Sequence, residues 1–66
     1  MEYNKKQLKA LAYGFLVEFC ADNPENYSTK QWNKKINELI KDTEEWLNEE
    51  VIEELKEPYL IHYNEF

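Results

Sequence analysis

Hydrophobic residues recur every three or four positions through most of this chain, with polar residues between them. This spacing places the apolar side chains on one side of an α-helix. It predicts helices over residues 5–21, 29–41 and 43–56. Residues 25–27 are expected to form a loop, and residues 59–66 form an apolar, aromatic tail. We therefore expect a single all-α domain over residues 1–66.

The predicted boundaries depend on capping signals at the helix starts and on proline at the ends. A Ser, Asn or Asp followed three positions later by Gln or Glu can satisfy the free backbone N–H groups of a helix start. Three such pairs precede the predicted helices: Asn4 and Gln7, Ser28 and Gln31, and Asp42 and Glu45. Pro24 and Pro58 follow the first and third helices, and proline disfavours helical geometry in the residue before it.

The boundary between the second and third helices is less sharply marked, because neither glycine nor proline interrupts the chain at Asp42-Thr43. A helical apolar period continues across it through Trp32, Ile36, Leu39, Thr43 and Trp46. One kinked helix over residues 29–56 is therefore the alternative to two helices. The inward positions are Trp32, Ile36, Leu39 and Ile40 on the second helix and Leu47, Val51 and Leu55 on the third.

The first predicted helix is apolar on two sides. Its core stripe consists of Leu8, Leu11, Ala12, Phe15 and Phe19, and the almost opposite side of Ala10, Tyr13, Val17 and Cys20. We expect this helix to be central, covered by the other helices and by the tail residues Tyr59, Leu60, Ile61, Tyr63 and Phe66. There are two alternatives. In one, Tyr13, Val17 and Cys20 form a homodimer interface on the second apolar side. In the other, the tail is an arm that adds to a partner. Gly14 either lets another backbone approach closely or is simply tolerated.

These patterns predict a small three-helix bundle with a packed C-terminal aromatic tail. Charge is distributed unevenly along the chain. Residues 42–55 carry seven acids and no base, whereas residues 1–41 carry seven lysines against five acids. On a continuous third helix, one exposed face would hold Asp42, Glu45, Glu49 and Glu53, with Glu50 and Trp46 beside it. Such a face either only keeps the protein soluble or docks on a basic partner. Trp46 would anchor that contact or, alternatively, bridge the second and third helices.

The sequence lacks the chemistry expected of an enzyme. Paired carboxylates on an exposed helix have no cleft to separate their pKa values. A phosphate-binding glycine loop and a Glu-x-x-His metal motif are both missing. Cys20 and His62 are single residues of their types, too few for a zinc site; we expect Cys20 to be buried and His62 to pack within the tail. We predict no catalysis, no cofactor and no metal.

Composition limits the classes of partner and the cellular compartment that we expect. The chain has no arginine, the residue best suited to phosphate recognition, and its net charge is −6, so we expect no direct binding of nucleic acid. A single cysteine, and the lack of a signal peptide or membrane-length apolar run, predict a soluble cytoplasmic protein without membrane contact. Residues with AT-rich codons, such as Lys, Asn, Tyr and Ile, are abundant, which favours a low-GC bacterium, its phages or its mobile elements as the source.

In composition the chain resembles the short acidic inhibitors of phages and mobile elements, which include anti-CRISPR and anti-restriction proteins and nuclease-inhibiting immunity proteins. The resemblance covers no motif and transfers no residue roles. The charge pattern leads us to the hypothesis of a non-enzymatic inhibitor that blocks the basic surface of a host nuclease or CRISPR effector by nucleic-acid mimicry. The contact residues would be Asp42, Glu45, Trp46, Glu49, Glu50 and Glu53. The alternatives are a homo-oligomeric structural or regulatory protein and an antitoxin.

Overall fold

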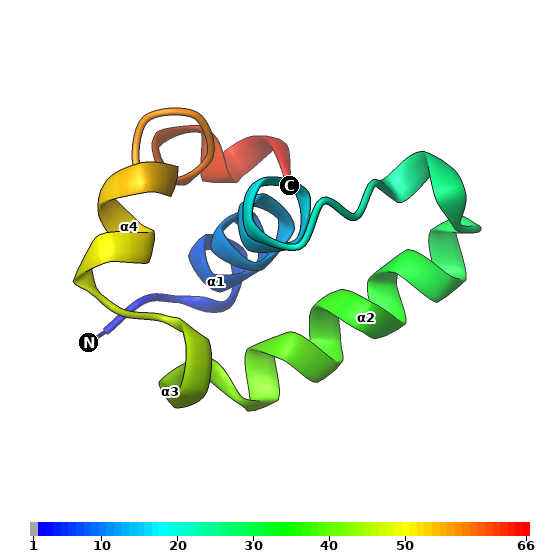
Figure 1. Cartoon of the computed structure of the whole chain (residues 1–66), viewed down its shortest axis with the longest axis horizontal. Coiled ribbons are helices and arrows are strands. Elements are labelled where there is room, and N and C mark those ends of the chain that lie inside the picture. The colour runs from blue at the N-terminus through cyan, green and yellow to red at the C-terminus, as the bar shows by residue number, and fades with distance from the viewer. Residues whose placement is uncertain (1) are drawn as a thin grey trace.

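In this computed structural model the elements are all helical, and three of them begin at a capping side chain, namely Asn4, Ser28 or Asn48. The structure describes residues 2–66. The elements are α1 (Lys5–Gly14), the π-helical turn η1 (Phe15–Phe19), the 3₁₀ turn η2 (Pro24–Asn26), α2 (Thr29–Lys41), α3 (Thr43–Trp46), α4 (Glu49–Leu55) and the 3₁₀ segment η3 (Leu60–Glu65) (Figure 1). The described part of the chain contains no strand, so the all-α prediction is confirmed.

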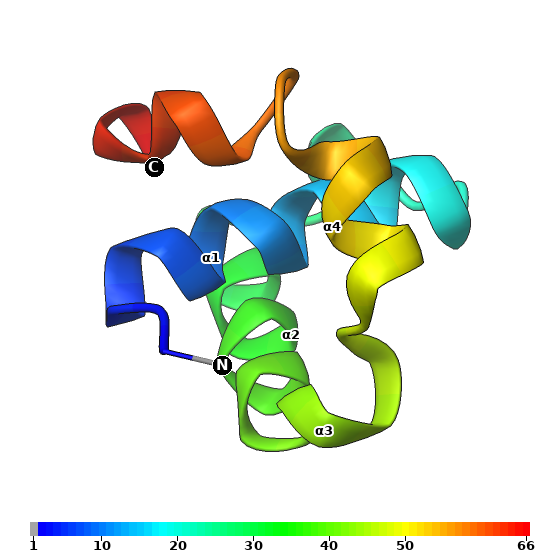
Figure 2. The ribbon, with the colours of Figure 1, turned by 90° about the vertical axis from the view of Figure 1, so that its left-hand side faces the viewer.

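The first helix lies at the centre of the molecule. Figure 1 shows α1 almost end-on with α2, α4 and the C-terminal segment around it, and Figure 2 shows the same arrangement from the side. All three elements contact α1, and Ala10, Leu11 and Ala12 are fully buried in it. The expectation of a helix covered on both sides is therefore confirmed. The radius of gyration is 10.9 Å, close to the roughly 11 Å typical of a folded domain of this length.

The C-terminal tail packs on α1 rather than extending away from it. The Tyr13 ring lies 5.0 Å from the Phe66 ring and 6.0 Å from the Tyr59 ring, measured between centroids, and it meets Trp32 of α2 edge-on at 5.4 Å. Aromatic pairs at these separations add to the stabilisation from buried area. The second apolar side of the first helix is thus covered within the chain, as the first of the two interpretations predicted.

The tail segment η3 consists of 3₁₀ turns on either side of a kink at His62, where φ is −106° and ψ is 23°. Residues three apart share a face of a 3₁₀ helix, and Leu60, Tyr63 and Phe66 are the half-buried set. Ile61 and His62 point away, with Ile61 60% exposed. The expectation that His62 packs within the tail is wrong; its Nδ1 instead lies 3.3 Å from a Glu65 carboxylate oxygen.

Gly14 makes room for the approach of the tail to α1. A Cβ atom at this position would lie 2.6 Å from Cδ2 of Tyr59 and 2.9 Å from Cδ2 of Leu55. A close approach therefore occurs at Gly14, but two side chains make it, so the alternative of an approaching backbone is wrong. The Tyr59 hydroxyl also donates a hydrogen bond to the Glu18 carboxylate at 2.8 Å.

Both capping boxes at the starts of α1 and α2 are confirmed. In the first, the Gln7 N–H donates to Asn4 Oδ1 and the Asn4 N–H donates to Gln7 Oε1, each at 2.8 Å. In the second, the Gln31 N–H donates to Ser28 Oγ at 3.2 Å and the Ser28 N–H donates to Gln31 Oε1 at 3.0 Å. These reciprocal bonds satisfy backbone donors that have no partner inside the helix.

The end of the first helix differs from the prediction. The regular helix stops at Gly14, and in the π-helical turn that follows the Cys20 N–H bonds to the Phe15 carbonyl. A π-helical turn contains about one residue more than an α-helical turn. The side chains that follow are therefore rotated away from the expected stripe. Phe19 is consequently 47% exposed and Cys20 is exposed, although both were expected to be buried. Ala21 ends the segment with a left-handed φ of 53°.

Candidate interaction surface

The acidic segment, residues 42–55, folds as two short helices rather than one. After α3, Leu47 is extended with φ −87° and ψ 114°, and α4 begins after Asn48. Asn48 Oδ1 accepts a hydrogen bond from the Val51 N–H at 3.0 Å and so caps α4. The continuous third helix over residues 43–56 and the kinked helix over residues 29–56 are both wrong.

The break has a packing reason. On a continuous helix Trp46 and Leu47 would point about 100° apart, so Trp46 would lie beside the exposed face. With the chain extended at Leu47, both side chains join Val51 and Leu55 in the hydrophobic core. The expected side-chain cap by Asp42 is also absent: its side chain makes no cap hydrogen bond, and α3 begins with the Glu45 N–H donating to the Asp42 carbonyl at 2.9 Å.

Trp46 is a core residue. It is 7% exposed, its ring lies 4.8 Å from the Phe15 ring, and its Nε1–H donates to the Leu39 carbonyl at 2.8 Å. The side chain therefore joins α3 to both η1 and α2, which agrees with the alternative of a bridge between helices. Its indole is not available as a surface anchor, and that part of the contact prediction is corrected.

The seven carboxylates of the acidic segment are all exposed. They are Asp42, Glu44, Glu45, Glu49, Glu50, Glu53 and Glu54. In residues 2–66 the ion pairs join Lys35 to Asp22 and His62 to Glu65, so none involves the acidic segment. Because of the break, Asp42 and Glu45 no longer continue the row formed by Glu49 and Glu53, which remain one helical turn apart on α4.

Position along each helix divides six of these acids into two groups, and the seventh, Asp42, lies at the N-cap of α3. Glu44 and Glu45 lie in the first turn of α3, and Glu49 and Glu50 lie in the first turn of α4. Negative charge at a helix N-terminus is favourable by about 0.3–1 kcal/mol per residue. Glu53 and Glu54 lie near the C-terminal end of α4, where the same charge is unfavourable. Local helix stability therefore accounts for the first group and not for Glu53 and Glu54.

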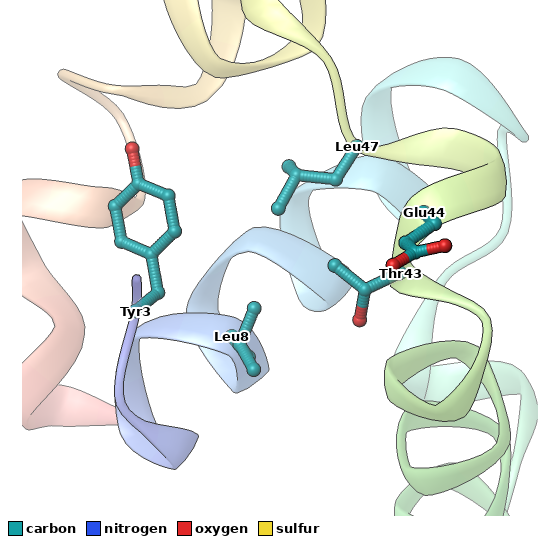
Figure 3. A pocket seen from close by; sticks show the side chains of 5 residues that line it. All are labelled: Tyr3, Leu8, Thr43, Glu44 and Leu47. Carbon is teal, nitrogen blue, oxygen red and sulfur yellow. The ribbon is translucent and has the colours of Figure 1, made fainter. Parts of the chain in front are cut away.

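A hollow with a mixed apolar and polar lining opens beside the acidic helices. We call it the Tyr3 hollow; it has a volume of about 440 Å³ and is lined by Tyr3, Leu8, Thr43, Glu44 and Leu47. Figure 3 shows these side chains arranged around an open space between the N-terminal segment, α1 and α3. Tyr3 and Leu8 are half-buried, Leu47 is buried, and Glu44 is exposed.

A second hollow of about 350 Å³ shares Tyr3 and is otherwise lined by Glu49, Ile52 and Glu53 of α4. Tyr3 thus lies between two depressions lined by both apolar and polar groups; the first has Glu44 along it, and the second has Glu49 and Glu53. Tyr3, Leu8 and Glu44 were not among the predicted contact residues, because no local pattern links residue 3 to residue 44. The N-cap at Asn48 could have been found, since Asn followed by two acids is a typical helix start.

The predicted oligomer residues do not form one open apolar face. Tyr13 is half-buried beneath Phe66 and Tyr59, and Val17 is half-buried against the core. Cys20 is exposed beyond the π-helical turn. Most of the apolar area that suggested an interface is therefore used inside the molecule.

The strongest polar cluster is structural and lies away from the acidic segment. Lys35 Nζ is 2.6 Å from the Asp22 carboxylate, and the Tyr27 hydroxyl donates to the same carboxylate at 2.9 Å. The Lys35 ammonium, followed by the Tyr27 hydroxyl, holds the pKa of Asp22 below its usual value, and the Asp22 carboxylate raises the pKa of Lys35. The cluster fastens the loop after η1 to α2.

Neither metal-binding geometry nor a membrane-spanning element occurs in the part of the chain that the structure describes. Residues 2–66 contain no group of three or more His, Cys, Asp or Glu side chains placed to hold a metal ion. None of the described helices combines the length and the apolarity needed to cross a bilayer. Comparison with protein-family models, with curated proteins and with solved structures gives no match for this chain.

Proposed function

We propose that this protein is a non-enzymatic inhibitor that binds the basic surface of a nucleic-acid-handling protein through its acidic segment. The observation that supports this is the set of seven exposed carboxylates without a described ion pair, concentrated on two adjacent short helices. Uncompensated charge of one sign attracts a partner of the opposite sign and speeds its association. Glu53 and Glu54 support the proposal most strongly, because negative charge near the C-terminal end of α4 is unfavourable for the helix.

We propose nucleic-acid mimicry over a smaller surface than the sequence suggested. Carboxylates one helical turn apart have Cβ atoms about 5–6 Å from each other, on the order of the spacing between successive phosphates. With the helix broken at Leu47 and Asn48, three such pairs remain on α4: Glu49 with Glu53, Glu50 with Glu53, and Glu50 with Glu54. The mimic is therefore a patch on α4 and not a long acidic rod. The coverage of α1 within the chain removes the motive for proposing a homo-oligomer.

The test is capture of a partner from the lysate of a low-GC bacterium on immobilised protein, with elution by a salt step and competition by duplex DNA. We expect a basic nucleic-acid-binding protein that salt releases and DNA displaces, since charge contacts are screened by salt. The triple variant Glu49→Gln, Glu53→Gln, Glu54→Gln should reduce capture at least ten-fold.

The matched control is Glu2→Gln, Glu25→Gln, Glu38→Gln, which removes three exposed carboxylates outside the acidic segment. It changes the net charge by the same amount and should leave capture close to that of the wild type. Equal loss in both variants would mean that only the total charge matters. Capture that DNA does not displace would also contradict the proposal.

A further inference from the structure

We infer that the Tyr3 hollow receives one apolar side chain of the basic partner, flanked in the partner's sequence by Lys or Arg. The inference depends on the proposed function and specifies how that contact is made. Charge alone would attract many basic proteins, whereas an apolar anchor beside the charges selects among them.

The hollow has the size and lining needed for such an anchor. Tyr3, Leu8 and Leu47 supply apolar walls, and Figure 3 shows the Tyr3 ring along one side of the open space with Leu8 and Leu47 on other sides of it. Its volume of about 440 Å³ exceeds the roughly 150 Å³ of an apolar cavity that holds benzene. An aliphatic or aromatic side chain can therefore enter without displacing the walls.

The charges around the hollow define the flanking residues of the occupant. Glu44 lies at its edge, and Glu49 and Glu53 lie beyond Tyr3 along the second hollow. Among the residues that the structure describes, neither lining includes a basic side chain. A neutral apolar segment would draw these carboxylates out of water without a counter-charge, which is costly. A segment with Lys or Arg on both sides of the apolar residue would pair with them instead.

Other hollows on the molecule lack this combination. The one between α1, α2 and the C-terminal residues is aromatic but includes Lys9 as well as Glu65. The one beside Ile61 includes Lys56 among three carboxylates, Glu53, Glu54 and Glu57. A basic segment would meet a like charge at either place. The Tyr3 hollow and its neighbour combine apolar walls with carboxylates alone, so charge complementarity favours the basic segment there.

The test compares two synthetic peptides of equal charge, Lys-Arg-Leu-Arg-Lys and Lys-Arg-Ser-Arg-Lys, titrated into isotopically labelled protein and followed by NMR at low salt. We expect the leucine peptide to bind at least ten-fold more tightly, equivalent to about 1.4 kcal/mol. The largest amide shifts should lie at Tyr3, Leu8, Thr43 and Leu47. Added salt should weaken both peptides, because they share the same charges.

Two variants localise the effect. Tyr3→Ser should remove the preference for leucine, and Glu44→Lys, at an exposed position that does not disturb the core, should weaken both peptides. The control Glu25→Gln should preserve the preference. Equal affinity for the two peptides, or shifts centred elsewhere, would overturn the inference and leave the proposed function standing. Binding of neither peptide would also overturn it, while capture with the acidic triple variant would still decide the proposed function.

Discussion

At the residue scale, the fold explains why glycine occupies position 14, which the sequence left open. Glycine inside a helix costs about 1 kcal/mol relative to alanine, so its presence in α1 needs a compensating gain. The gain is the contact of Tyr59 and Leu55 with the helix surface at distances that a methyl group would forbid. The position is therefore set by the approach of residues more than forty positions away.

We predict that Gly14→Ala destabilises the protein by about 1 kcal/mol, because overpacking costs about 1–3 kcal/mol and outweighs the improved helix propensity. Urea unfolding followed by circular dichroism measures the change. Asn37→Ala, at an exposed position of α2, is the control and should stay within about 0.5 kcal/mol of the wild type. A fully stable Gly14→Ala protein would show that the Tyr59 ring can move aside without loss.

At the element scale, the break between α3 and α4 changes the meaning of the acidic run. A single helix would carry repelling carboxylates along its whole length, whereas two short helices place four of the seven acids in favourable first turns. The capping side chain is Asn48, within the segment that was predicted to be continuous. The end of α4 still carries Glu53 and Glu54 against the direction of the helix dipole.

We predict that Glu53→Gln, Glu54→Gln is more stable than Glu49→Gln, Glu50→Gln by about 1 kcal/mol, from the position of each pair relative to the helix dipole. Both double variants remove the same charge and the same three repulsive pairs within α4, Glu49/Glu53, Glu50/Glu53 and Glu50/Glu54, so each is the control for the other. Denaturant unfolding at low ionic strength measures the difference. Equal stabilities would show that the ends of α4 do not distinguish these acids.

At the scale of the whole molecule, one hydrogen bond joins two segments that are far apart in the sequence. The Tyr59 hydroxyl meets Glu18 across a sequence separation of 41 residues and joins the start of the tail to the π-helical turn. Burial, followed by the hydrogen bond to Glu18, raises the pKa of Tyr59 from 10.0 to about 12. The neutral phenol is thus the form that the folded protein favours.

We predict a loss of stability at alkaline pH that depends on Tyr59. A tyrosine whose pKa is higher in the folded protein contributes its stabilisation fully below about pH 10 and loses it as the pH rises through about 12. Unfolding free energies of the wild type and Tyr59→Phe, measured across this range, should therefore converge and then cross, with the wild type more stable only at the lower pH. Parallel curves for the two proteins would contradict the prediction.

The sequence by itself determined the features whose interactions are local. The capping boxes of Asn4 and Ser28 depend on partners three residues away, and the inward stripes of α2 and α4 depend on helical periodicity. The all-α class and the location of the acidic segment followed directly. Exposure of its seven carboxylates also followed, because uncompensated charge is rarely buried.

Only the tertiary structure decided the features that depend on segments distant in the sequence. Trp46 is buried because Phe15 and the Leu39 carbonyl receive it, and that contact favours the break that separates α3 from α4. Cys20 and Phe19 are exposed because the π-helical turn rotates them outward. The Tyr3 hollow exists because the N-terminal segment and Leu47 meet in space. No local pattern encodes such meetings, since each depends on the packing of the whole chain around α1.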